Sequence, residues 1–90
     1  MGEEKKNRFI PPLDITSLLV PFYTQALVKL GEINDPLSGK SELDLEYARR
    51  LIDLIDLFKE KTKGNLTEEE ETFLNSILYK LKSTFFEKSK

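Results

Sequence analysis

The chain has 90 residues, enough for one small domain, and its 14 Lys and Arg nearly balance its 16 Asp and Glu, leaving a net charge of −2. This balance argues against a nucleic-acid partner, because binding to phosphates normally requires a basic excess. The sequence contains neither cysteine nor histidine. Disulfides, thiolate metal sites and the usual proton shuttle near neutral pH are therefore excluded.

Residues 1–13 are predicted to precede the first helix. Residues 1–8 are mostly charged and lack apolar anchors, which predicts a disordered tail. Residues 9–13 read FIPPL, and we expect them to be extended because proline disfavours helix in the residue before it. Residues 9–88 are expected to form a single helical domain. The tail has no apolar core and no apolar run reaches about 20 residues, so we expect no signal peptide, no membrane span and a cytoplasmic location.

Residues 15–30, ITSLLVPFYTQALVKL, form the most apolar stretch, and Lys29 is the only charged residue among them. This stretch predicts a helix, and we expect Asp14 or Thr16 to cap its start and Gly31 to end it. Apolar side chains fall on nearly every side of this helix, a pattern typical of a helix buried all round. So short a chain has little with which to bury it, and we expect it to contact a second subunit or another partner. Its candidate interface residues are Leu18, Leu19, Phe22, Tyr23, Ala26, Leu27 and Leu30.

Pro21 lies inside this predicted helix, where it cannot donate a backbone hydrogen bond. We expect a bend between Leu19 and Phe22, produced in one of two ways. Either the helix is kinked at Pro21, or it starts near Pro21 with the proline in its favoured first turn.

Residues 44–63 predict a second helix, which is capped by Asp44 and stops before Gly64. Its charged residues gather into a polar stripe about 120° wide. Apolar residues, Leu54 and Ile55 among them, occupy most of the remaining two thirds. One neighbour cannot cover so wide an arc, so we expect this helix to be central, with both Leu54 and Ile55 in the core.

The third helix has the strongest local signal. Thr67 and Glu70 match a capping box, and residues 68–71 are all glutamate. An apolar stripe about 140° wide follows, the ordinary width for a helix packed on one side. Only residues 64–66 separate it from the second helix, which predicts an antiparallel hairpin. Tyr79 and Phe86 lie on the opposite side from the stripe and are candidates for a second contact surface.

The predicted fold is all-α: an antiparallel helical hairpin plus a kinked apolar N-terminal helix, completed by oligomerisation. The predicted function is a non-enzymatic interaction or scaffold module that self-associates as a homodimer or higher oligomer and also serves an unknown protein partner. No catalytic, cofactor-binding or metal-binding residue is assigned, and the four glutamates are interpreted as a helix start.

Two other functions are weighed against this one. A metal-dependent hydrolase that uses carboxylates alone would need Asp or Glu facing inward from several helices. Burial of Asp53 or Asp56 opposite Glu42 or Glu32 would favour it. A peripheral membrane protein would use the first helix as an interfacial anchor, but that helix lacks the usual basic polar face.

Three blocks of the sequence carry a family resemblance: PPLD at 11–14, LGEINDP at 30–36 and KTKGNLTEEE at 61–70. Over residues 9–86 the chain resembles a family of small uncharacterised bacterial proteins, classed only as a domain of unknown function. Pro21 departs from the run of small and apolar residues usual at that point of the family. The resemblance implies a short, all-helical, cytoplasmic protein and carries over no catalytic residue.

Overall fold

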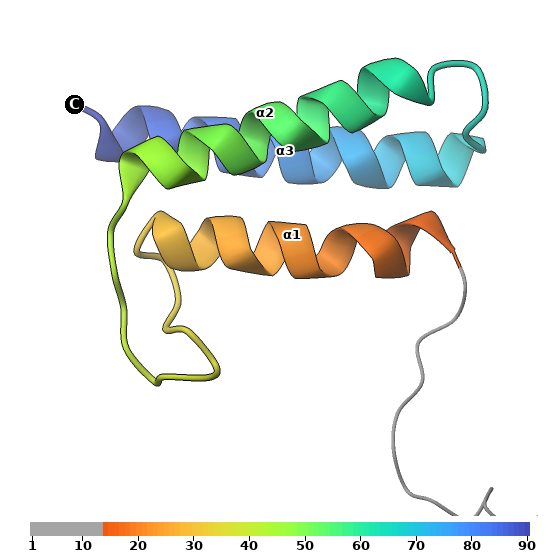
Figure 1. The fold of residues 1–90 in the computed structure, drawn as a ribbon. Coiled ribbons are helices and arrows are strands. Elements are labelled where there is room, and N and C mark those ends of the chain that lie inside the picture. Colours follow the sequence, from red (N-terminus) through yellow and green to blue (C-terminus); the bar gives the residue numbers. More distant parts are fainter. Residues whose placement is uncertain (1–13) are drawn as a thin grey trace, which may run out of the picture.

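The computed structural model describes residues 14–90, and this part of the chain contains three helices and no strand (Figure 1). They are α1 (Ile15–Lys29), α2 (Leu45–Lys61) and α3 (Glu68–Lys88). The prediction of an all-α fold is confirmed. The tail predicted at 1–8 and the extended segment predicted at 9–13 lie outside the described residues.

The helices form a small bundle in which each one contacts the other two. Residues 62–67 reverse the chain, so α2 and α3 make the predicted antiparallel hairpin, and α1 lies alongside both (Figure 1). The connection from α1 to α2 also reverses the chain, so α1 is antiparallel to α2. A backbone bond from the Asp44 N–H to the Lys29 carbonyl (2.7 Å) joins the end of α1 to the start of α2. None of the helices in residues 14–90 is long and apolar enough to cross a bilayer.

Side-chain caps begin all three helices. Asp14, rather than Thr16, caps α1 by accepting a hydrogen bond from the Ser17 N–H over 2.8 Å. Asp44 caps α2 as predicted. At α3 the capping box is complete, because the Thr67 hydroxyl accepts from the Glu70 N–H (3.1 Å) and the Glu70 carboxylate accepts from the Thr67 N–H (2.8 Å). These short-range signals place the helix starts.

Gly31 ends α1 in the left-handed conformation, with φ of 77°. Its N–H donates to the Val28 carbonyl over 3.0 Å. The Glu32 N–H donates to the Leu27 carbonyl over 2.9 Å. Together these two bonds form a Schellman motif, which satisfies the last helical carbonyls and favours glycine at this position.

Of the two alternatives expected at Pro21, a helix that starts near this residue is wrong. α1 is a single helix from Ile15 to Lys29 that includes Pro21, and Figure 1 draws it without a break. Leu19 and Ala26, on either side of the proline, are both buried in the same core, so both halves of the helix pack against the rest of the bundle. Pro21 itself is exposed, so its ring and the Ser17 carbonyl that loses a helical partner lie on the solvent side.

The core runs along the line where the three helices meet. The apolar pattern of α1 is typical of burial on every side, but α2 and α3 cover only one of its faces, and Leu18, Val20 and Phe22 remain exposed. The buried apolar residues of the cluster are Leu19, Ala26, Leu30, Ala48, Leu51, Ile52, Ile55, Leu74, Ile77, Leu78 and Leu81.

Ion pairs join the helices at their surfaces. The Lys82 ammonium lies 2.8 Å from the Asp56 carboxylate and links α3 to α2. Lys88 lies 3.4 Å from Glu32, which joins the end of α3 to the residue whose N–H completes the Schellman motif. All four side chains are a third or more exposed, so we expect each pair to contribute at most about 1 kcal/mol.

Replacing Thr67 with Ala should lower the free energy of unfolding by about 1 kcal/mol, because the α3 cap loses its acceptor. Urea denaturation followed by circular dichroism measures the change. Thr72→Ala is the matched control, since Thr72 is exposed within the same helix and caps nothing. Equal stability of the two variants would contradict the role of Thr67.

Pro21→Ala should raise the free energy of unfolding by roughly 2 kcal/mol. Alanine restores the helical donor and removes the ring clash, worth about 3 kcal/mol, while the unfolded chain gains up to about 1 kcal/mol of entropy. The same denaturation experiment measures the gain. If Pro21→Ala were less stable than the unsubstituted protein, the proline would be contributing to the stability of α1.

Candidate interaction surface

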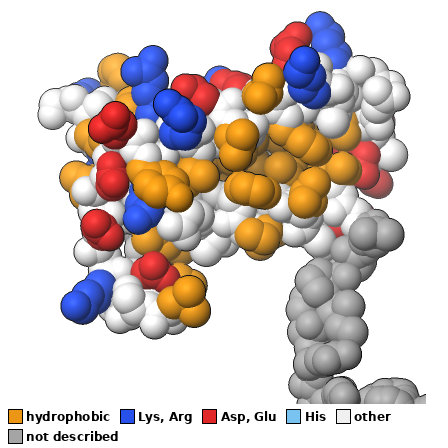
Figure 2. Space-filling view, in the orientation of Figure 1, with side chains coloured by type: hydrophobic (Ala, Val, Ile, Leu, Met, Phe, Trp, Pro, Cys, Tyr) orange, Lys and Arg blue, Asp and Glu red, His pale blue; other side chains and the backbone are white. Residues whose placement is uncertain are grey.

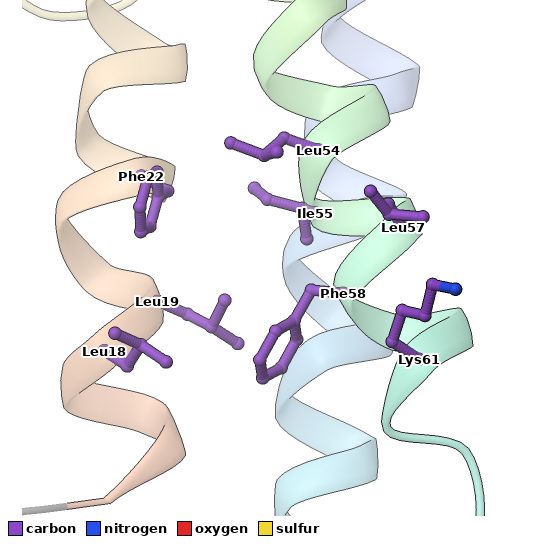
Figure 3. Close-up of a pocket in the computed structure, with 8 residues that line it drawn as sticks. All are labelled: Leu18, Leu19, Phe22, Leu54, Ile55, Leu57, Phe58 and Lys61. Atoms are coloured by element: carbon purple, nitrogen blue, oxygen red, sulfur yellow. The ribbon is translucent and has the colours of Figure 1, made fainter.

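An apolar groove runs between the N-terminal half of α1 and the C-terminal half of α2 (Figure 3). It has a volume of about 370 Å³. This volume falls within the range of about 300–1,000 Å³ found for sites that bind small molecules or side chains. The groove is lined by Leu18, Leu19, Phe22, Leu54, Ile55, Leu57, Phe58 and Lys61.

The helical repeat builds the α1 wall. Leu18 and Phe22 are four residues apart and therefore share one face of the helix. Their side chains are 51% and 38% exposed. Leu19 lies between them in sequence but points into the core and is only 2% exposed. The α1 wall thus combines two accessible rim residues with one buried floor residue.

The α2 wall likewise combines a buried floor residue with exposed rim residues. Ile55 is 1% exposed and belongs to the floor, while Leu54 and Leu57 are 43% and 52% exposed. Figure 3 shows Leu54 reaching toward α1 and the Lys61 amine turned away from it. Lys61 is the only charged side chain among the lining residues. The groove is therefore an apolar surface with one cation at its edge.

Figure 2 shows hydrophobic side chains gathered on the face that carries α1 and α2. A cluster of exposed apolar side chains is a candidate site of interaction. The geometry suits the burial of apolar groups and offers no acid–base pair.

The acidic side chains of residues 14–90 do not converge on one another. Asp56 pairs with Lys82 across α2 and α3, and Glu42 lies 3.8 Å from Lys29. Asp53 is exposed on α2. Within residues 14–90, no group of three or more acidic side chains is placed to hold a metal ion.

The structure divides the interface residues predicted on α1. Leu18 and Phe22 line the groove, as an interface requires. Leu19, Ala26 and Leu30 are at most 2% exposed and belong to the core of their own chain, which corrects their assignment as contact residues. The reason is that α2 and α3 together cover one full side of α1. The remaining two predicted residues, Tyr23 and Leu27, are partly buried against the same core.

The second predicted surface lies on α3 and takes no part in the groove. Tyr79 and Phe86 are 76% and 63% exposed. The Lys90 amine lies 5.3 Å from the centre of the Phe86 ring. The two aromatic rings are thus accessible, but they line no cavity with the residues described above.

Sequence reasoning missed the contribution of α2 to the groove. Leu54 was predicted to be in the core together with Ile55, and only Ile55 is. Two neighbouring helices cannot cover an apolar arc as wide as two thirds of α2, so the edge of the arc that carries Leu54 and Leu57 stays exposed. The width of the apolar arc was the available signal, but the edge of the arc was assigned to the core.

The chain belongs to the family described as Domain of unknown function (DUF1844), whose model matches residues 12–87. This confirms an uncharacterised domain family, and the family description assigns no activity. No curated protein and no solved structure gives a significant match to the chain.

Ile55→Asp should unfold the protein, because it places an unpaired charge in the core. Leu54→Asp, the same change one residue earlier, should leave the fold intact, because its carboxylate reaches solvent. The helical signal in circular dichroism and the thermal midpoint compare the two variants. Similar losses for both would mean that Leu54 is covered.

Proposed function

We propose that this DUF1844 member is a non-enzymatic helical interaction module, acting in the cytoplasm, that self-associates as a homodimer or higher oligomer through the groove face. The observation that carries the proposal is the exposed apolar rim of the groove. Its members are Leu18 and Phe22 on α1 and Leu54 and Leu57 on α2.

The spacing of exposed residues on α2 favours another helix as the occupant. Tyr47, Arg50, Leu54, Leu57 and Lys61 are all exposed and recur at alternating intervals of three and four. This is the spacing with which one helix packs against another in a two-helix seam. A second copy of the chain can supply such a helix, and a two-fold dimer uses the same patch on both subunits.

The area that a stable interface buries indicates how far the contact must extend. A stable interface buries about 800 Å² per partner. The groove rim alone does not reach that area, so the contact must extend along the exposed stripe of α2, including Tyr47 and Arg50. Burial of apolar surface stabilises an interface by about 25 cal/mol per Å² before the cost of association.

The positions of the acidic residues support a non-enzymatic role. A carboxylate hydrolase needs acids that face inward from several helices. Asp56 and Glu32 instead contact lysines, and Asp53 is exposed. The groove offers no pair of titratable side chains that could exchange a proton.

We expect light scattering at micromolar concentration to give a mass at least twice the 10.4 kDa of one chain. Leu57→Asp should return the mass to 10.4 kDa with its helical signal unchanged, because a carboxylate on the rim opposes apolar burial. Leu37→Asp is the matched control, since Leu37 is 97% exposed and lies outside the groove.

A mass of one chain for the unsubstituted protein would contradict self-association. Co-sedimentation of that monomer with liposomes, lost in Leu57→Asp, would assign the groove face to a membrane surface instead. A dimer that Leu57→Asp leaves intact would place the contact elsewhere, and Tyr79→Asp then tests the α3 surface.

A further inference from the structure

We propose that the segment Phe9–Leu13 binds in the α1–α2 groove of its own chain and competes there with a second copy. Only the competition rests on the proposed function. Docking of the segment requires the groove but no second copy. The segment is the apolar stretch FIPPL, which separates the mostly charged residues 3–8 from the start of α1.

The cap of α1 sets the register of this segment against the groove. Because Asp14 is the N-cap, Leu13 is the residue before the cap and Leu18 is the fourth residue of the helix. Apolar residues at these two positions pack together in a hydrophobic staple, which directs the chain as it enters the helix. Leu18 also lines the groove. A staple between Leu13 and Leu18 therefore delivers the preceding chain to one end of the groove.

The segment is long enough to follow the groove. Leu18 and Phe22 are four residues apart, which is about 6 Å along a helix. Four residues of extended, polyproline-like chain, from Leu13 back to Phe9, span about 12 Å. The segment can therefore pass from the Leu18 end of the groove to Phe22 and Leu54 without leaving the face.

The chemistry of the segment suits a groove that offers few hydrogen-bond partners. Phe9, Ile10 and Leu13 carry apolar side chains, and Pro11 and Pro12 carry no backbone N–H. Each missing donor removes a group whose burial against apolar side chains would be unfavourable. The two prolines also restrict the free segment, so less conformational entropy is lost when it binds.

Competition follows from the shared site. The rim residues that a second copy needs, Leu18, Phe22, Leu54 and Leu57, are those that the segment would cover. The affinity of a partner falls in proportion to the fraction of chains whose groove is open. The segment thus sets the concentration at which the protein self-associates.

The absence of cysteine from the chain allows a direct test. A single Asn7→Cys substitution carries a nitroxide spin label two residues before Phe9, and ¹⁵N NMR records which backbone amides it broadens. We expect broadening at Phe22 and Leu54 in the middle of the groove, with the reduced label as the baseline. Phe9→Ser with Ile10→Ser, made in the labelled chain, should return both amides to that baseline, because the apolar anchors are lost.

Two further measurements separate the alternatives. Leu57→Asp removes an apolar side chain from the groove and should also abolish the broadening. This substitution leaves the labelled segment itself unchanged. In a mixture of labelled ¹⁴N chains with unlabelled ¹⁵N chains, the broadening of the groove amides should be weaker than it is within one labelled ¹⁵N chain. Broadening in the mixture that equals or exceeds it would mean that the segment binds a second copy, and broadening that persists in both variants would mean that it does not use the groove. Either result overturns the proposal.

Light scattering on the same samples tests the competition. Phe9→Ser with Ile10→Ser should lower the dissociation constant for self-association several-fold. If every chain stays at 10.4 kDa while the label still broadens groove amides, self-association fails and the docking of the segment stands. If the chains associate equally with and without the substitutions, the segment does not compete, and this part of the inference fails.

Discussion

The fold depends on the burial of one stripe of α1 between α2 and α3. Leu19, Ala26 and Leu30 form this stripe, and each is at most 2% exposed. Burying the two leucines stabilises the fold by about 3–6 kcal/mol, which equals or exceeds the cost of about 3 kcal/mol for a proline inside a helix. Because the stripe continues on both sides of Pro21, core packing outweighs the local preference for a break. The unbroken α1 is thus a consequence of tertiary contacts.

The same packing produces the groove. When α1 turns Leu19 and Ala26 inward, Leu18 and Phe22 are left on the edge that faces α2. Small domains bury a lower fraction of their surface than large ones. With three helices in residues 14–90, part of the apolar arc of α2 has no neighbour. The groove therefore arises where the edges of two wide apolar arcs meet.

The connection between α1 and α2 decides which residues face one another across the groove. The Schellman motif at Gly31 ends α1, and the bond from Asp44 to the Lys29 carbonyl returns the chain to the same end of the bundle. Consequently α2 runs back along α1, and its C-terminal half lies beside the N-terminal half of α1. Phe22 and Leu54 line the same groove for this reason, although the two residues are far apart in the sequence.

The sequence by itself determined the number of helices in residues 14–90, the starts of α2 and α3 and the hairpin that they form, whereas it left the start of α1 open. Asp14, Asp44 and Thr67 signal helix starts through contacts that span three residues, so such signals can be read locally. Only the tertiary structure decided the course of α1 through Pro21 and the exposed edges of α1 and α2. Leu54 and Ile55 have the same apolar character, yet one lies on the rim and the other in the core. Periodicity reports how wide an apolar arc is, but the positions of neighbouring helices determine which part of that arc is covered.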